Sequence, residues 1–361
     1  MLLPARHPAP PAGLLALLAL SLFLPGAAWA QAPQQFPPAP DNETPATVRP
    51  VFEFHSAFWT NLHLMLYEQA RVRAKRSTSR GSGAALAESG EAATRARHGD
   101  PASPEWNAAV NYYVREFADR DLLFDSSQVA INNRLAEMES CPDLSGRSSA
   151  SCESGLRPEL IAALERAAPL YRAHGWAEDD HANRVWIKAV APLVRQLGGT
   201  LSEQLAGVYH AEWPSSPIRV DVVCYGGPLG AYTTLEPVHI TISSTDLRNQ
   251  GTAGFEILFH EGSHALAKAV VDGIVRECRA RQLPIPRDLW HALLFYTTGQ
   301  VVKRMLEQQS LAASYTPYAY RFGLFDRGWQ NYQRALERYW QPYLDGKVGF
   351  DLALSQLVEG V

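Results

Sequence analysis

Apolar side chains recur every three or four residues over most of the chain, which is the spacing of one face of an α-helix. Two short β-branched runs bounded by Pro and Gly, residues 218–226 and 238–244, instead indicate strands, and residues 231–236 are expected to extend the second strand. The pattern therefore predicts a mainly α fold with a small β element, an α+β fold. Helices are expected over residues 50–76, 103–124, 157–173, 177–208, 254–282, 286–309 and 326–346.

The N-terminus has the composition of a secretory signal. Arg6 precedes an apolar run of about a dozen residues, and small residues at Ala28 and Ala30 precede a predicted cleavage after Ala30. The run is shorter than the ~20 residues of a membrane-spanning helix. We therefore expect residues 1–30 to be a signal peptide and the mature protein to be periplasmic or secreted, with no membrane span.

Composition divides the rest of the chain into three parts. Residues 31–48 are rich in Pro and Gln, which indicates a flexible N-terminal segment. Residues 49–216 carry helical patterns and are expected to form a helical domain or subdomain, with a surface loop over residues 77–103. Residues 217–361 contain the strands and the later helices and are the expected catalytic region.

The overall composition is that of a globular protein. Hydrophobic residues make up 46% of the sequence and charged residues 19%, which suits a sizeable core. The formal net charge is −4, and it becomes −5 when the leader with Arg6 is removed. A mildly acidic chain of this kind is not expected to bind nucleic acid.

Four cysteines lie beyond the leader. Cys141 and Cys152 stand at the two ends of a polar loop rich in Ser and Gly, and we predict a disulfide between them, because an exported protein can keep disulfides. Cys224 lies in a strand pattern and Cys278 in a helical one, and these two either pair or stay buried as thiols. No Cys-x-x-Cys pair is present, so a cysteine-rich zinc site is not expected.

The run FHEGSHA at residues 259–265 places two histidines four residues apart. In a helix His260 and His264 lie on one face, roughly 6 Å apart along the axis, and both imidazoles reach one metal ion. Glu261 lies about 100° further around the helix, where its carboxylate can take a proton from a zinc-activated water. We therefore predict that His260 and His264 bind Zn²⁺ and that Glu261 is the general base.

This HEGSH run after a strand resembles the zincin superfamily of zinc metallopeptidases, with a gluzincin-like order of elements over residues 218–310. The resemblance implies a zinc-dependent hydrolase that acts on peptides or proteins, with an extended substrate paired to the strand at 238–244. The third ligand departs from the known patterns. Metzincins would have Gly and His where this chain has Ala267 and Val270, and a thermolysin-like glutamate would fall near residue 284, within LPIP.

Three residues remain as candidates for the third zinc ligand. Glu277 is roughly 20 Å beyond His264 along one helix, too far to reach the ion unless the helix breaks at Gly273. His291 lies among apolar residues of the next helix, where ligation would give a reason for its burial, so we predict His291. Asp288 is the next candidate, and it could instead cap that helix or orient His291.

A hydrolase of this type also needs a hydrogen-bond donor for the oxyanion. Among the tyrosines and the arginine of residues 315–321, Tyr318 beside Pro317 is the expected donor. The alternative to an enzyme is a non-catalytic envelope protein with a structural or vestigial metal site. Four protein ligands would favour that alternative, whereas an open fourth position would favour the enzyme.

Overall fold

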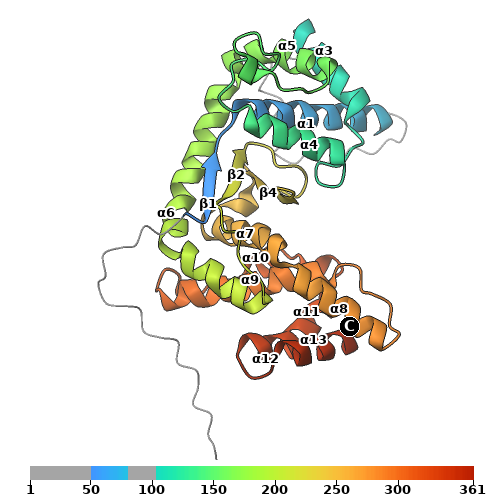
Figure 1. The fold of residues 1–361 in the computed structure, drawn as a ribbon, viewed down its shortest axis with the longest axis vertical. Coiled ribbons are helices and arrows are strands. Elements are labelled where there is room, and N and C mark those ends of the chain that lie inside the picture. The colour runs from blue at the N-terminus through green and yellow to red at the C-terminus, as the bar shows by residue number, and fades with distance from the viewer. Residues whose placement is uncertain (1–49, 80–102) are drawn as a thin grey trace, which may run out of the picture. The chain divides into compact units, whose positions relative to one another are not determined.

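The computed structural model describes residues 50–79 and 103–361 (Figure 1). The predicted signal peptide, the N-terminal segment up to residue 48 and most of the predicted loop at 77–103 lie outside these residues. The described part is mainly helical with one small sheet, which confirms the predicted α+β fold class. No helix in this part combines the length and the hydropathy that a bilayer crossing requires.

Helices lie before and after the strands at residues 218–243 along the chain. The earlier ones are α1 (Phe58–Ser79), α3 (Pro104–Glu116), α4 (Ser126–Glu137), α5 (Pro158–His174) and α6 (Trp176–Tyr209). The later ones are α7 (Gly251–Ser263), α8 (Lys268–Ala280), α9 (Leu289–Gln308), α10 (Tyr318–Arg321), α11 (Gln330–Ala335), α12 (Gln341–Leu344) and α13 (Phe350–Glu359). Ser103 occupies the N-cap position of α3, and its side chain accepts a hydrogen bond from the Trp106 amide.

The sheet has four strands in the order β1–β2–β4–β3. Strands β1 (Phe52–His55), β2 (Ile218–Val223) and β4 (Val238–Ser243) are parallel, and β3 (Ala231–Leu235) runs antiparallel to β4. Two expectations are therefore wrong. Residues 231–236 do not extend the second strand but fold back beside it, and β4 has neighbours on both sides, so it has no free edge for a substrate.

Strand β1 was not foreseen, because residues 50–76 were expected to be helical throughout. Phe54 lies opposite Val220 in the register of β1 and β2, so the strand depends on a partner far along the chain. Local periodicity carries no signal of such a pairing. Through β1, the part of the chain before residue 216 contributes to the sheet, while the predicted domain boundary at residues 216 and 217 stays a prediction.

The two faces of the sheet differ in character. One face is apolar and belongs to the larger hydrophobic core, which it shares with α6, α7 and α9; its members are Val220, Val222, Ala231, Ile240 and Ile242. The other face carries buried polar groups: Asp221 lies 2.8 Å from His239 Nε2 and accepts from Arg219 Nη2 at 2.8 Å. Asn132 of α4 donates to Thr241 on this face. Helices thus cover both faces, and the histidine-bearing helix α7 packs on the apolar one.

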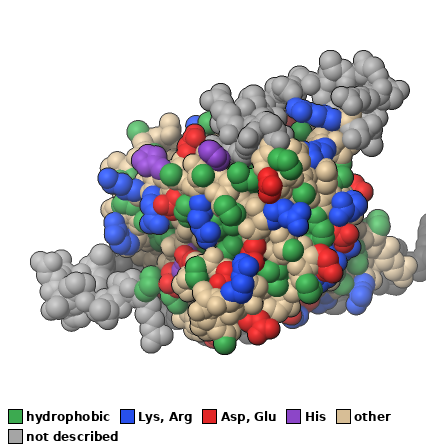
Figure 2. Space-filling view, turned by 90° about the horizontal axis from the view of Figure 1, so that it is seen from above, with side chains coloured by type: hydrophobic (Ala, Val, Ile, Leu, Met, Phe, Trp, Pro, Cys, Tyr) green, Lys and Arg blue, Asp and Glu red, His purple; other side chains and the backbone are tan. Residues whose placement is uncertain are grey.

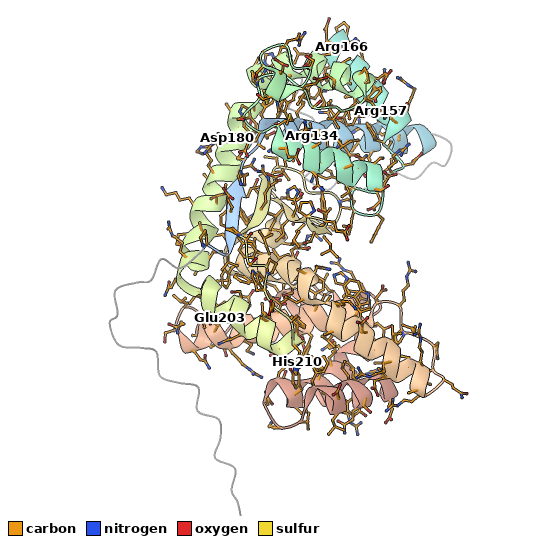
Figure 3. The ribbon with its side chains drawn as sticks, in the orientation of Figure 1. Arg134, Arg157, Arg166, Asp180, Glu203 and His210 are labelled. Carbon is orange, nitrogen blue, oxygen red and sulfur yellow. A yellow bond between two sulfur atoms is a disulfide. The ribbon has the colours of Figure 1, made fainter. Side chains whose placement is uncertain are left out.

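The predicted disulfide between Cys141 and Cys152 is present, with the two Cα atoms 5.5 Å apart. Arg134 of α4 (Figure 3) donates to the carbonyl oxygens of Glu153 and Ser154 and so holds the end of this loop. A disulfide indicates an oxidising compartment outside the cytoplasm. The two remaining cysteines, Cys224 and Cys278, are both buried.

Charged side chains of both signs are interspersed over the face that Figure 2 shows, with apolar and other side chains between them. This agrees with a composition of 33 basic and 37 acidic residues.

Candidate metal centre

Helix α7, which carries the first four residues of HEGSH, is buried on every side. All residues from Ala253 to Ser263 are buried, and the helix contacts α6, α9, β3 and β4. Gly262 permits part of this packing, because a Cβ atom there would lie 2.6 Å from Cη2 of Trp213. A larger side chain at Gly262 would displace the indole ring. The HEGSH motif therefore packs directly against the hydrophobic core.

Three histidines meet where the end of α7 faces the start of α9. His260, His264 and His291 each offer a ring nitrogen, and these nitrogens lie within 4.8 Å of one another. The Nε2 atoms of His260 and His291 are 3.2 Å apart. A tetrahedral ion with metal–nitrogen distances of about 2.0–2.1 Å separates its ligands by roughly 3.3–3.4 Å, so the spacing fits a shared ion. The three histidines predicted from the sequence therefore come together and could hold a metal ion.

Burial favours the neutral form of all three imidazoles. It lowers the pKa of His264 to about 3 and the pKa of His291 to about 4, and it holds the pKa of His260 well below the usual 6.5. The neighbouring imidazoles lower the pKa of His260 and His264 further. Only a neutral imidazole offers a lone pair to a metal. The three histidines are therefore in the protonation state that binds a cation.

Helix α7 ends at Ser263. A 3-10 turn covers residues 264–266 before α8 begins, so the single helix predicted over 254–282 is wrong. The break lies well before Gly273, the position at which a break was considered. Glu277 lies on α8, where its carboxylate accepts from Arg281 at 2.7 Å, and it is not part of the three-histidine group.

The third histidine lies in the first turn of α9. This helix begins at Leu289, not at Pro286 as the sequence suggested. Asp288 occupies the N-cap position, but its side chain makes no capping hydrogen bond. Its negative charge raises the pKa of His291 against the effect of burial, so it acts on the histidine from outside the group of ligands.

Glu261 lies beside the histidines with its carboxyl group held in place. Its Oε2 atom is 3.8 Å from His264 Nε2 and accepts a hydrogen bond from Thr233 Oγ1 at 2.7 Å. Only 5% of Glu261 is exposed, and this burial raises the pKa of its carboxyl to about 7, against the opposing effect of the Thr233 hydrogen bond. A carboxyl group with a pKa near neutrality is suited to both accepting and releasing a proton.

Aromatic rings fix the orientation of the ligand imidazoles. Phe295 of α9 stacks on His260, with 3.5 Å between ring centroids and 16° between planes. Trp290 stacks on His291 at 5.1 Å, and Trp329 meets His291 edge-on at 5.7 Å. These contacts limit ring rotation.

The ring of Phe295 stacks on both Tyr318 and His260, so Tyr318 contacts the three-histidine group through Phe295. Tyr318 stacks on Phe295 with centroids 6.0 Å apart, and its hydroxyl donates to Asn249 Oδ1 at 3.4 Å. The amide of Tyr318 donates to both carboxyl oxygens of Glu256 at 2.9 Å. Glu256 is one helical turn before His260, and burial raises its pKa to about 7. The predicted role of Tyr318 as oxyanion donor stays a prediction.

Sequence reasoning missed three residues of this site: Thr233, Glu256 and Phe295. Two of them carry a signal that could have been read, because Glu256 precedes His260 by four residues and Phe295 follows His291 by four, so each shares a helix face with a ligand. Thr233 lies on β3, with no fixed spacing to the motif, and only the fold brings it to Glu261.

We compared the chain with protein-family models, with curated proteins and with solved structures, and none of them matched. The likeness to zincins therefore rests on the HEGSH run and on the order of elements around it. Any assignment of function depends on the geometry described above.

Proposed function

We propose that the protein is an exported zinc-dependent hydrolase that acts on peptide bonds. The observation that supports this most strongly is geometric: three histidines whose ring nitrogens lie within 4.8 Å of one another stand beside the buried carboxyl group of Glu261, whose Oε2 atom is 3.8 Å from His264 Nε2. A purely structural metal site has no need of an extra carboxyl group beside its ligands.

The residues have distinct roles in this proposal. His260, His264 and His291 hold the ion through ring nitrogens. When bound, zinc supplies a Lewis acid that makes water more acidic and polarises the substrate carbonyl. The carboxylate of Glu261 takes the proton from the attacking water and then delivers it to the departing amine, which requires both protonation states at neutral pH.

Zinc is favoured over calcium and magnesium by the chemistry of the donors. Three imidazoles and no carboxylate or thiolate suit a borderline ion, whereas calcium and magnesium prefer oxygen ligands. Among the described residues the group has three members, so a fourth coordination position remains for water or substrate. This favours the enzyme over the alternative, a non-catalytic envelope protein with a structural or vestigial metal site.

A peptide substrate is supported by the position of β3. This strand lies at the edge of the sheet, and the hydroxyl of its residue Thr233 donates a hydrogen bond to Glu261. An extended peptide added to the outer edge of β3 would therefore run close to the general base. Tyr318 is our candidate for the oxyanion donor, because the hydrogen bond from its hydroxyl to Asn249 Oδ1 is long, at 3.4 Å.

Metal analysis and turnover together test the proposal. The mature protein should contain about one zinc per chain and cleave members of a mixed peptide library, and a chelator should abolish both properties until zinc is returned. A stoichiometric zinc site without any cleavage over a broad range of peptides and pH would favour the structural alternative. Cleavage that survives removal of the metal would exclude the zinc mechanism.

A further inference from the structure

The side chain of Thr233 makes two short contacts with one residue, Glu261. Its Oγ1 atom lies 2.7 Å from Oε2 of the carboxyl group and 3.0 Å from the backbone oxygen of the same glutamate. Both residues are nearly inaccessible, at 6% and 5% exposed. A hydroxyl bound to a carboxylate in such a dry place holds it strongly, because little water competes.

The strand that carries Thr233 is itself well anchored. Thr233 lies opposite Ile240 in the register of β3 and β4, and Ile240 is part of the main core. Threonine is branched at Cβ, which restricts its χ1 torsion. The hydroxyl is therefore presented to Glu261 from a fixed backbone by a stiff side chain, and the carboxyl group has one preferred orientation.

A hydroxyl group has one proton and can also accept, and this fits both states of Glu261 during a reaction cycle. When the glutamate is ionised, Thr233 donates to Oε2. When the glutamate has taken a proton, that proton can be donated to Oγ1, and the Thr233 hydrogen turns to the backbone oxygen of Glu261. The contact is kept in both states, so the carboxyl group need not move as the proton arrives and leaves.

We propose that Thr233 is a positioning residue, which holds the carboxyl group of Glu261 in the orientation needed for proton transfer. The inference rests on the proposed hydrolase function. It gives the edge strand β3 a role in the chemistry through the side chain of Thr233. This role is separate from the proposed pairing of a peptide substrate with the backbone of β3.

Thr233→Val tests the proposal, because valine has nearly the same shape and lacks the hydroxyl. Turnover, kcat, should fall roughly 10–100-fold, the range expected when a hydrogen bond to a charged group is lost, while KM and zinc content stay near those of the wild type. Thr233→Ser keeps the hydroxyl and should restore most of kcat.

Thr234→Val is the matched control. Thr234 is the next residue of β3 and is equally buried, and its hydroxyl bonds the carbonyl oxygen of His239. The same chemical change there should leave kcat unchanged. An unchanged kcat in Thr233→Val, a loss of zinc in that variant, or an equal loss of kcat in Thr234→Val would each overturn the proposal.

A second measurement separates this proposal from the proposed function itself. If the wild-type protein holds zinc but cleaves no peptide, the hydrolase function fails, and the position of Glu261 is then compared in crystal structures of the wild type and Thr233→Val. Displacement of the carboxyl group in the variant supports the positioning role. A carboxyl group that keeps its place without the hydroxyl contradicts it.

Discussion

The indole ring of Trp213 lies against Gly262, so that a Cβ atom at Gly262 would be 2.6 Å from the ring. Gly262 is the central residue of HEGSH, between His260 near the end of α7 and His264, which follows that helix. The candidate metal-binding motif and the packing of the core are therefore coupled at one position. Substitutions that do not touch a ligand should still affect the site.

Gly262→Ala should lower the free energy of unfolding by about 1–3 kcal/mol, because the added methyl group overpacks the space beside Trp213. It should also reduce zinc occupancy, since both histidines flank the displaced segment. Urea denaturation and metal analysis measure the two effects. Gly207→Ala in α6 is the control: no atom lies within 4 Å of its Cβ position, and alanine should be neutral or stabilising by up to about 1 kcal/mol. Equal behaviour of the two variants would argue against the steric explanation.

His291→Ala should reduce zinc binding as strongly as His264→Ala, because the two imidazoles belong to one group of three. Asp288→Asn should weaken binding much less, since its charge acts on His291 from outside that group. Glu277→Gln should have no effect, because Glu277 pairs with Arg281 on α8. Competition with a chromogenic zinc chelator ranks the four affinities. Full zinc retention by His291→Ala would remove it from the ligand set.

Glu256 should make the stability of the protein depend on pH. Burial raises its pKa from 4.5 to about 7 in the folded state, so folding favours the protonated form. The stabilisation is fully present below about pH 4.5 and is lost as the pH rises through 7. The wild type should therefore lose roughly 1–3 kcal/mol of unfolding free energy between about pH 5 and pH 8, relative to Glu256→Gln, which does not titrate. Urea unfolding of both proteins in a chelating buffer measures this difference, and parallel pH profiles would contradict it.

The Cys141–Cys152 disulfide should contribute roughly 3 kcal/mol to stability in the chain-entropy description of a loop of this size. Replacement of both cysteines by serine should lower the urea midpoint without affecting zinc content, because the two cysteines belong to a different hydrophobic cluster from the residues that pack around the histidines. Mass spectrometry of a non-reducing digest should show the two peptides linked. Separate, alkylated cysteines in protein isolated from its native compartment would contradict the expected bond.

The sequence was informative where the relevant groups are close along the chain. His260, Glu261 and His264 were recognised because helical geometry alone places them together, and Cys141 and Cys152 because a short polar loop joins them. The prediction of His291 required an assumption, namely that the next helix packs against the helix with His260. The apolar residues around His291 supported that assumption.

The sequence was uninformative where long-range contacts decide the outcome. Phe54 forms a strand because Val220 lies beside it, and the strand at residues 231–236 reverses beside β4 instead of extending it. The break after Ser263 interrupts a pattern that remains apolar at helical spacing through the break, so tertiary packing overrides the local preference. Thr233 reaches Glu261 only through this folded arrangement.

The most direct test of the account is the substitution Glu261→Gln in the zinc-loaded protein. Gln is nearly the same size and can still accept from Thr233, but it cannot take a proton at neutral pH. The variant should keep its zinc and its unfolding midpoint. Cleavage of the peptide library should fall by about 10²–10⁴-fold, the usual contribution of a general base. Equal cleavage by wild type and variant, with zinc confirmed in both, would contradict the central claim that Glu261 is the base.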